Sequence, residues 1–439
     1  MTQSLPLEER LTQLLTHLGI ERAHWAACMP RDWQGLVAKQ PESIASLTLL
    51  CPMGINVGLL SSESLPVLCI SGDKGRSAQE TQRAAKDVPQ AKIVTLRDYF
   101  SPSWADAAKD RGEEVDRAIS EFIIGLHAKL QPASLTKGSG EFAEIVYSIH
   151  GKGQPLVLMP LALSPSQWDP LIARLGDEFC TITLSGPHLG MVAHLEARAQ
   201  SGYMRVIDTL IAEIGLAPGQ SILEIGCGPG AIVRRLAKKT AGQNRIVGAD
   251  VNRYLMREAA ALAKRDGVAQ WIEFQEGNAE KLPFADNSYD VAMACTVMEE
   301  GDADRMIAEL TRVTKPGGRV ANVVRSIDMP RWVNLQLSAA LKYKVEAPGL
   351  VGGNVNAEGC ADMSLYRRMH AAGLCNIAKM PQWASHHGGE RLQYMQDRIA
   401  GVLSADELVE WRAAIAQAQA EGSFFMTEPF HCAVGKKAS

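Results

Sequence analysis

A glycine-rich turn after a short apolar run is the feature that most constrains the fold of this chain. Residues 222–230 read Ile-Leu-Glu-Ile-Gly-Cys-Gly-Pro-Gly, and a helical stretch, 231–239, follows. The apolar run predicts a buried strand, and the glycines let the backbone turn tightly and approach a ligand with no Cβ in the way. A ligand would then lie over the carboxyl end of the strand and the N-terminus of the helix.

A carboxylate follows where a nucleoside would need one. Residues 245–250 read Arg-Ile-Val-Gly-Ala-Asp and predict a second strand that ends at Asp250. A carboxylate at that place accepts hydrogen bonds from both ribose hydroxyls. The turn also fits the dinucleotide pattern G-x-G-x-x-G/A through Gly226, Gly228 and Ala231. By itself it therefore does not separate a nicotinamide or flavin site from an S-adenosylmethionine site.

Three downstream segments separate these kinds of site. Residues 277–284 (Gly-Asn-Ala-Glu-Lys-Leu-Pro-Phe) lie where a third strand ends, and 287–294 predict a turn and a fourth strand. Residues 315–319 (Lys-Pro-Gly-Gly-Arg) predict a turn before a fifth strand, 320–324. In this order the segments resemble the class I S-adenosylmethionine-dependent methyltransferases, over about residues 200–326. The resemblance implies a Rossmann-like seven-stranded α/β sheet, with S-adenosylmethionine as cofactor and S-adenosylhomocysteine as product.

The resemblance also implies which residues hold the cofactor. The glycines of the turn would line its methionine and ribose, and Asp250 would hold the ribose hydroxyls. Asn278 and Ala279 would contact the adenine, and Cys295 and Thr296 would lie under the sulfonium. The predicted cofactor-binding residues are Tyr203, Glu224, Gly226, Cys227, Gly228, Gly230, Asp250, Asn252, Asn278, Ala279, Cys295 and Thr296.

The predicted reaction is an in-line displacement, in which the protein aligns donor and acceptor and excludes water. A general base is optional for an acceptor that is already nucleophilic. Glu299, Glu300 and His431 are the candidate catalytic residues. The two glutamates would equally cap the next helix, and His431 would more simply be a buried histidine of an apolar strand. Glu300 stands where close relatives often have His, and Asn278 where they usually have Asp, so a base at residue 300 is in doubt.

Residues 1–190 resemble an α/β-hydrolase domain whose parts are circularly permuted. Residues 8–50 look like its elbow segment and 65–126 like its last strands and final helix, whereas 146–190 look like its opening strands. One sheet is still expected to close, because the termini of a compact domain often lie close together. The G-x-S-x-G elbow is replaced by Trp-Ala-Ala-Cys-Met-Pro-Arg at 25–31, so no hydrolase activity is predicted.

The other positions of a hydrolase triad are also altered. The acid would fall near Gly75, in Gly-Asp-Lys-Gly, and the histidine near Tyr99, in Arg-Asp-Tyr-Phe, so no member of the triad is clearly present. Cys28 in the elbow is a nucleophile or an inert buried thiol, and the absence of a histidine at the base position favours the inert thiol. The domain is predicted to cover the methyltransferase site or to mediate formation of a homodimer.

The second domain is predicted to span residues 191–439, and it begins with a long helix over about 193–214. Two insertions, at about 327–362 and 384–425, are predicted to build the acceptor pocket, and the first would act as a lid that contains the pair Gly352-Gly353. Residues 430–435 are predicted to be a closing antiparallel strand.

Two histidines lie in the second insertion. His386 and His387 are predicted to be solvated loop residues, because no third ligand stands at a readable spacing. No metal site is therefore predicted.

Composition limits the remaining possibilities. The chain has 439 residues, with 45 Lys+Arg against 49 Asp+Glu, and so a net charge of −4. A nucleic-acid acceptor is not expected, because no basic stripe with interleaved aromatic residues is present. No membrane partner, signal peptide or spanning segment is predicted, and nine scattered cysteines favour a reduced, cytoplasmic protein. A non-catalytic cofactor sensor or scaffold and an NAD(P)-dependent oxidoreductase remain as alternatives.

Overall fold

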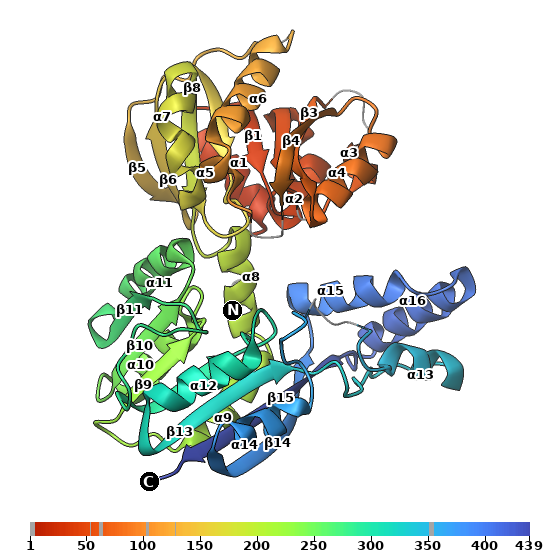
Figure 1. The fold of residues 1–439 in the computed structure, drawn as a ribbon. Helices are drawn as coiled ribbons and strands as arrows, with labels where there is room; N and C mark the ends of the chain where they lie inside the picture. The colour runs from red at the N-terminus through yellow and green to blue at the C-terminus, as the bar shows by residue number, and fades with distance from the viewer. Residues whose placement is uncertain (1–4, 53, 61–64, 102–104, 128, 351–354) are drawn as a thin grey trace. The chain divides into compact units, whose positions relative to one another are not determined.

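The fold was analysed in a computed structural model. The structure describes residues 5–52, 54–60, 65–101, 105–127, 129–350 and 355–439, apart from the side chains of residues 76 and 390. The chain divides into two compact units, Met1–His194 and Leu195–Ser439 (Figure 1). The helix α8 (Gly190–Ala199) contains the boundary between them. Each unit is built around its own sheet.

The N-terminal unit contains an eight-stranded sheet in the order β4-β3-β2-β1-β7-β8-β6-β5. The central strands β1 and β2 are buried along their whole length, which fits parallel strands that are covered by helices on both faces. Its strands are β1 (Ala23–Ala27), β2 (Ile44–Leu50), β3 (Val67–Lys74), β4 (Lys92–Phe100), β5 (Gly138–Phe142), β6 (Ile145–His150), β7 (Gln154–Leu158) and β8 (Phe179–Ser185). Its helices are α1 (Leu7–His17), α2 (Pro30–Lys39), α3 (Val57–Leu60), α4 (Arg76–Asp87), α5 (Ala107–Asp110), α6 (Gly112–Gly125) and α7 (Asp169–Glu178).

The pairing of β1 with β7 joins the two halves of this unit. The strands are parallel, and Trp25 lies opposite Val157. The segments before and after the predicted point of permutation thus share one sheet, as expected from the sequence. Membership of the hydrolase family stays a prediction.

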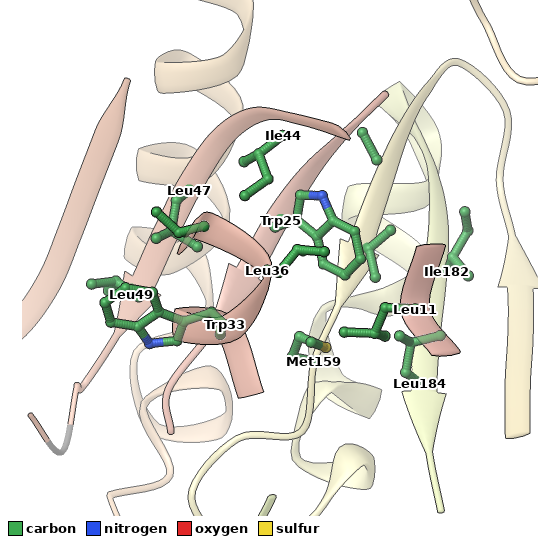
Figure 2. Close-up of a cluster of buried hydrophobic side chains, with 14 of the residues drawn as sticks. Leu11, Trp25, Trp33, Leu36, Ile44, Leu47, Leu49, Met159, Ile182 and Leu184 are labelled. Atoms are coloured by element: carbon green, nitrogen blue, oxygen red, sulfur yellow. The ribbon is translucent and has the colours of Figure 1, made fainter. Parts of the chain in front are cut away.

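Two apolar cores cover the two faces of the eight-stranded sheet. Residues from α1, α2 and α4 form one core with the strands, and residues from α5, α6 and α7 form the other. Figure 2 shows the first core, with side chains of α1, α2 and the strands gathered around Trp25. The Trp25 indole nitrogen donates to the Ser43 carbonyl oxygen at 3.4 Å, so its polar atom is also satisfied within the core.

The C-terminal unit contains a seven-stranded sheet in the order β11-β10-β9-β12-β13-β15-β14, which confirms the predicted Rossmann-like sheet. The first five strands in this order are parallel, whereas β15 is antiparallel to both neighbours, as predicted for the closing strand. The strands are β9 (Ser221–Ile225), β10 (Arg245–Asp250), β11 (Ile272–Glu276), β12 (Tyr289–Cys295), β13 (Thr314–Arg325), β14 (Leu374–His386) and β15 (Met426–Lys437).

Helices cover both faces of this sheet too. Apolar residues of α9 (Tyr203–Ile214), α10 (Ala231–Thr240) and α11 (Arg253–Arg265) pack against one face. Those of α12 (Ala303–Val313) and α14 (Ser364–Ala371) pack against the other. A third core joins α13 (Ala339–Glu346), α15 (Gly389–Ala400) and α16 (Ala405–Ala420) around the buried Trp411. These three helices lie within or beside the predicted insertions, and Gly352-Gly353 lies outside the described residues.

The predicted long helix over 193–214 is wrong, because the chain forms two helices there. α8 ends at Ala199 and α9 begins at Tyr203. A Cβ on Gly202 would lie 2.1 Å from the Ser385 carbonyl oxygen. The backbone of β14 therefore comes so close to residue 202 that only glycine fits there without a shift. The break between the two helices lies beside the end of β14.

None of the helices in the described part of the chain combines the length and the apolar character that a membrane crossing requires.

We expect Gly202→Ala to destabilise the C-terminal unit by about 1–3 kcal/mol, because the new methyl group would overlap the Ser385 carbonyl. Gly388→Ala is the matched control, since its Cβ would meet nothing within 4 Å and its φ of 177° suits any residue. Urea unfolding of the full chain, followed by circular dichroism, measures both. Equal stability of the two variants would show that the Gly202 contact does not constrain the fold.

Candidate cofactor site

The glycine-rich turn has the geometry that its sequence predicted. Gly226, Gly228 and Gly230 have φ values of 64°, 52° and 78°, a conformation that residues with a Cβ rarely adopt. At Gly226 a Cβ would also lie 2.3 Å from the side chain of Val297, in the loop after β12. The turn therefore needs glycine both for its backbone and for the close approach of the neighbouring loop.

Asp250 fixes this turn from the next strand. Its Oδ2 accepts a hydrogen bond from the Gly228 amide at 2.8 Å, and its Oδ1 accepts one from the Asn252 amide at 2.8 Å. Burial raises the pKa of Asp250, and these amide donors oppose the increase. Each carboxylate oxygen has a further lone pair, so it can accept a ribose hydroxyl as well. The Asn252 side chain is used differently: its Oδ1 caps α11 by accepting from the Tyr254 and Leu255 amides.

Glu224 presents an unpaired buried oxygen in the same region. Glu224 on β9 lies opposite Gly248 on β10, and Asp250 lies two residues further, so the two carboxylates share one face of the sheet. Glu224 is 2% exposed and its Oε2 has no hydrogen-bond partner. Burial, and then the nearby Asp250, raise its pKa well above the usual range. An unsatisfied buried carboxylate is costly, and a cationic ligand would satisfy it.

The backbone just after β12 is strained, and Arg198 of α8 binds to it through Thr296. Thr296 has a φ of 58°, a genuine outlier for a β-branched residue. Its Oγ1 accepts a hydrogen bond from the Arg198 Nη1 at 2.9 Å. The Arg198 guanidinium also lies 3.7 Å from the centre of the Tyr203 ring, which is 4% exposed. Arg198 is a candidate site residue that the sequence did not reveal, because one arginine in a helix gives no distinct signal.

The two predicted cysteines are inert. Burial raises the pKa of both Cys227 and Cys295 well above the usual value, and the Glu224 carboxylate adds to the effect. Neither thiol is therefore a nucleophile at neutral pH. Both side chains contribute to the core under the turn, and so they shape the floor of the site.

The predicted adenine contacts lie after β11. The Gly277 amide donates to the Asp250 carbonyl oxygen at 3.0 Å, which holds this loop against the end of β10. Asn278 turns inward on its own loop, where its Oδ1 accepts the Glu280 amide at 2.8 Å, and Ala279 is partly buried. The amide nitrogen of Asn278 remains for a ligand.

The candidate catalytic residues fall into two separate groups. Glu299 is completely buried, and its Oε1 accepts from the Arg325 amide at 2.8 Å and from the Arg325 Nε at 3.3 Å. Burial raises its pKa, and the charge of Arg325 opposes that increase. Glu300 is 55% exposed at its side chain, 3.6 Å from the same guanidinium. Both glutamates are thus arranged around one arginine, which supports a positioning role.

His431 belongs to a different chain of hydrogen bonds. Its Nδ1 pairs with the Tyr366 hydroxyl at 3.0 Å and its Nε2 with the Asp328 Oδ1 at 2.7 Å. The ring is 4% exposed. Both ring nitrogens are engaged within the protein, which supports the predicted structural role and leaves no free nitrogen for an acceptor.

The hydrolase positions of the N-terminal unit can be compared with a working elbow. Cys28 lies between β1 and α2, as an elbow nucleophile would, but its φ is not positive. Its thiol donates to the Cys51 carbonyl oxygen at 3.2 Å and is 1% exposed. Tyr99 stands at the histidine position, and its hydroxyl donates to Asp110 at 3.0 Å. This geometry supports the inert reading of Cys28.

Comparison with known proteins decides the nature of the second unit. Residues 222–318 match the family model described as a methyltransferase domain. The chain carries a class I, S-adenosylmethionine-dependent methyltransferase domain. This confirms the resemblance seen in the sequence, and the matched segment contains the glycine-rich turn, Asp250 and the loops after β11 and β12.

Curated relatives of the methyltransferase domain include two C-methyltransferases. Sterol 24-C-methyltransferase ERG6B of Gibberella zeae is 33% identical over 110 residues, which is 25% of this chain and 28% of that protein. The ubiquinone/menaquinone biosynthesis C-methyltransferase UbiE of Hahella chejuensis is 33% identical over 111 residues, 25% of this chain and 45% of that protein. The chain thus spans less than half the length of these relatives.

Solved structures resemble the chain more remotely. A geranyl diphosphate methyltransferase in complex with GPP and sinefungin is 16% identical, with 54% of this chain and 79% of that one covered and a TM-score of 0.34. The [4+2]-cyclase SpnF is 23% identical, with 53% and 81% covered and a TM-score of 0.33.

We expect Glu224→Gln to stabilise the ligand-free protein by about 0.5–2 kcal/mol at pH 8 and by less at pH 5. The folded-state pKa of Glu224 lies above the unfolded value of roughly 4.3, so the wild-type protein loses stability as pH rises from there toward the folded pKa. The variant lacks this loss. Urea unfolding at the two pH values measures the difference.

Glu300→Gln is the control for this experiment, because its side chain is 55% exposed. An equal effect of the two substitutions, or a wild-type protein whose deficit shrinks as pH rises, would contradict the assigned state of Glu224.

Proposed function

We propose that this protein transfers a methyl group from S-adenosylmethionine to a small-molecule acceptor. The observation that carries the proposal is the row of Asp250, Glu224 and Arg198 beside the glycine-rich turn. These groups match a nucleoside joined to an amino acid. The ribose needs acceptors, the α-ammonium needs a carboxylate, and the α-carboxylate needs a cation.

Each of these side chains would hold one part of the cofactor. Asp250 would accept the ribose hydroxyls with the lone pairs that Gly228 and Asn252 leave free. Glu224 would pair with the α-ammonium through its unpartnered Oε2. Arg198, which Thr296 orients, would pair with the α-carboxylate. The turn glycines and the loop of Asn278 and Ala279 would line the ribose and the adenine.

The protein's contribution to the reaction is alignment and exclusion of water. When bound, the cofactor supplies an activated methyl group on a sulfonium. Tyr203 is buried beside Arg198 and contacts Phe430 of β15, with ring centres 5.2 Å apart, so it would close the site above the methionine end. Glu299 and Glu300 would position Arg325 at the edge of the acceptor side. This arrangement supports acceptors that need no strong base.

We expect Asp250→Ala to weaken S-adenosylhomocysteine binding by at least about a hundredfold, because two charge-assisted hydrogen bonds to the ribose would be lost. Asp304→Ala is the control, since its side chain is 68% exposed on α12. Isothermal titration calorimetry measures both. Unchanged affinity in Asp250→Ala would contradict the placement of the ribose.

Arg198→Met is expected to weaken S-adenosylhomocysteine binding roughly tenfold or more. Its affinity for 5′-methylthioadenosine, which has no amino-acid carboxylate, is expected to stay within about twofold of wild type. Asp250→Ala should lose both ligands, so the pair of ligands separates loss of a contact from collapse of the site. Equal losses of both ligands in Arg198→Met would remove Arg198 from the carboxylate subsite.

Transfer of labelled methyl from S-adenosylmethionine into a small-molecule extract tests the activity itself. A labelled product establishes the transferase and gives the mass of the acceptor.

Binding of S-adenosylhomocysteine without any product would favour a sensor or scaffold. Binding of NADH without S-adenosylhomocysteine binding would favour an oxidoreductase.

The setting of the protein is also a proposal. Nine free cysteines, eight of them buried, support a reducing cytoplasm. We assign residues 1–190 and 191–439 to a hydrolase-like and a methyltransferase domain, and assign to the first a role in covering the site or in forming a homodimer. The curated relatives named for small-molecule substrates support a small-molecule acceptor, and a nucleic-acid or membrane partner is not expected.

A further inference from the structure

A group of ionisable side chains lies where β14 ends and β15 begins. His386 is 2% exposed at the end of β14, so the prediction of a solvated loop histidine is wrong for this residue. Glu428 on β15 is 7% exposed, and Arg331, beside the start of β15, is 3% exposed. Arg391 of α15 completes the group. We call these four residues the β15 cluster.

Glu428, the single carboxylate of the β15 cluster, is already paired with Arg391. Arg391 binds Glu428 through both Nε, at 3.0 Å from Oε2, and Nη2, which contacts Oε1. The His386 Nε2 lies 3.5 Å from the Glu428 Oε2. Burial alone would raise the pKa of Glu428, but the positive charges of Arg391 and Arg198, together with hydrogen bonds from His386 and Arg391, outweigh it and hold the pKa well below its usual range. Glu428 is therefore ionised and fully engaged.

Arg331 is left without an anion. Its Nε and Nη1 are buried and have no hydrogen-bond partner, and the His386 Nδ1 has none either. Burial lowers the pKa of Arg331 to about 10, so it is still charged at neutral pH. Among the side chains that the structure describes, the cluster thus holds two guanidinium groups and a histidine against one carboxylate. A buried cation without a partner is costly, which points to a missing negative group.

The β15 cluster is continuous with the methionine end of the cofactor site. Glu428 and Phe430 lie on the same face of β15, about 7 Å apart along the strand. Phe430 contacts Tyr203, and Tyr203 carries Arg198 on its ring. The charge of Arg198 also helps to lower the pKa of Glu428. Phe430, Tyr203 and Arg198 thus connect the cofactor site to Glu428 of the β15 cluster.

We propose that the β15 cluster binds an anionic oxygen group, a carboxylate or a phosphate, of the methyl acceptor, with Arg331 as its principal partner. The inference rests on the proposed methyltransferase function and narrows its acceptor to acidic small molecules. Arg331 is a specificity residue in this scheme, because it holds the acceptor at a distance from the reacting atom. Glu428 limits the positive charge of the subsite and orients Arg391.

The test uses the full chain saturated with S-adenosylhomocysteine, so that the cofactor's own carboxylate position is filled. Sodium phosphate and sodium acetate are titrated separately by calorimetry against sodium chloride of equal ionic strength. We expect one anion to bind per chain, and we expect Arg331→Met to weaken it at least tenfold. Arg305→Met, on a side chain that is 71% exposed, should leave the affinity unchanged.

Glu428→Gln is expected to change anion affinity in the opposite direction from Arg331→Met, and so it separates an effect on binding from an effect on folding. Loss of its charge should tighten phosphate or acetate binding several-fold, and the bound anion should raise the Tm of this variant more than that of wild type. A misfolded variant would instead lose S-adenosylhomocysteine together with the anion. Weaker binding in Glu428→Gln, no anion binding in the wild-type complex, or equal binding in Arg331→Met would each overturn the subsite.

Two further outcomes identify the source of the anion. Phosphate or acetate that binds only without S-adenosylhomocysteine, and competes with it, would assign the cluster to the cofactor carboxylate and overturn the acceptor assignment. The methyl-labelled product formed in extract should be retained on an anion-exchange column at pH 7, and a product in the flow-through would also overturn it. Failure of S-adenosylhomocysteine itself to bind the wild-type chain would refute the proposed function, and is read in the same calorimeter before any anion is added.

Discussion

The parallel pairing of β9 between β10 and β12 is the constraint on which the site depends. Because the three strands run in one direction, their carboxyl ends meet at one edge of the sheet. That edge brings the glycine-rich turn, Asp250 and Thr296 together although they lie far apart in sequence. The register then puts Glu224 and Asp250 on one face. A slip of β9 by one residue would turn Glu224 to the opposite face of the sheet, away from Asp250.

Three features of the C-terminal unit lower the free energy of unfolding of the ligand-free protein. Glu224 has a buried oxygen without a partner, Thr296 has a left-handed backbone, and Arg331 is a buried cation without an anion. Each feature opposes folding, and a ligand group of the right charge would relieve the two unpaired side chains, Glu224 and Arg331. The unpaired carboxylate of Glu224 and the unpaired guanidinium of Arg331 call for ligand groups of opposite charge, and this links the cofactor site to the proposed acceptor subsite. The cores on both faces hold these groups in place.

The two units differ in how their edge-of-sheet residues are used. In the N-terminal unit, Cys28 and Tyr99 stand at the nucleophile and histidine positions of the resemblance, but each is paired with a neighbour and neither has a positive φ. In the C-terminal unit, the corresponding edge is strained and under-satisfied. Local strain and unpaired polar atoms therefore separate a binding site from a structural one more clearly than the fold class does.

The sequence by itself determined the strand–turn–helix at 222–239, the place of Asp250 and the order of the parallel strands. These features follow from glycine spacing, apolar runs and residues within one βαβ unit, all of which are local. Tertiary structure decided the break at Gly202, the burial of His386, and the roles of Arg198, Arg331 and Glu428. Those depend on contacts between α8 and β12, or between the hairpin of β14 and β15 and the segments beside it. No local pattern encodes such contacts, because a charged residue has the same sequence signal whether the fold leaves it in water or buries it beside another charge.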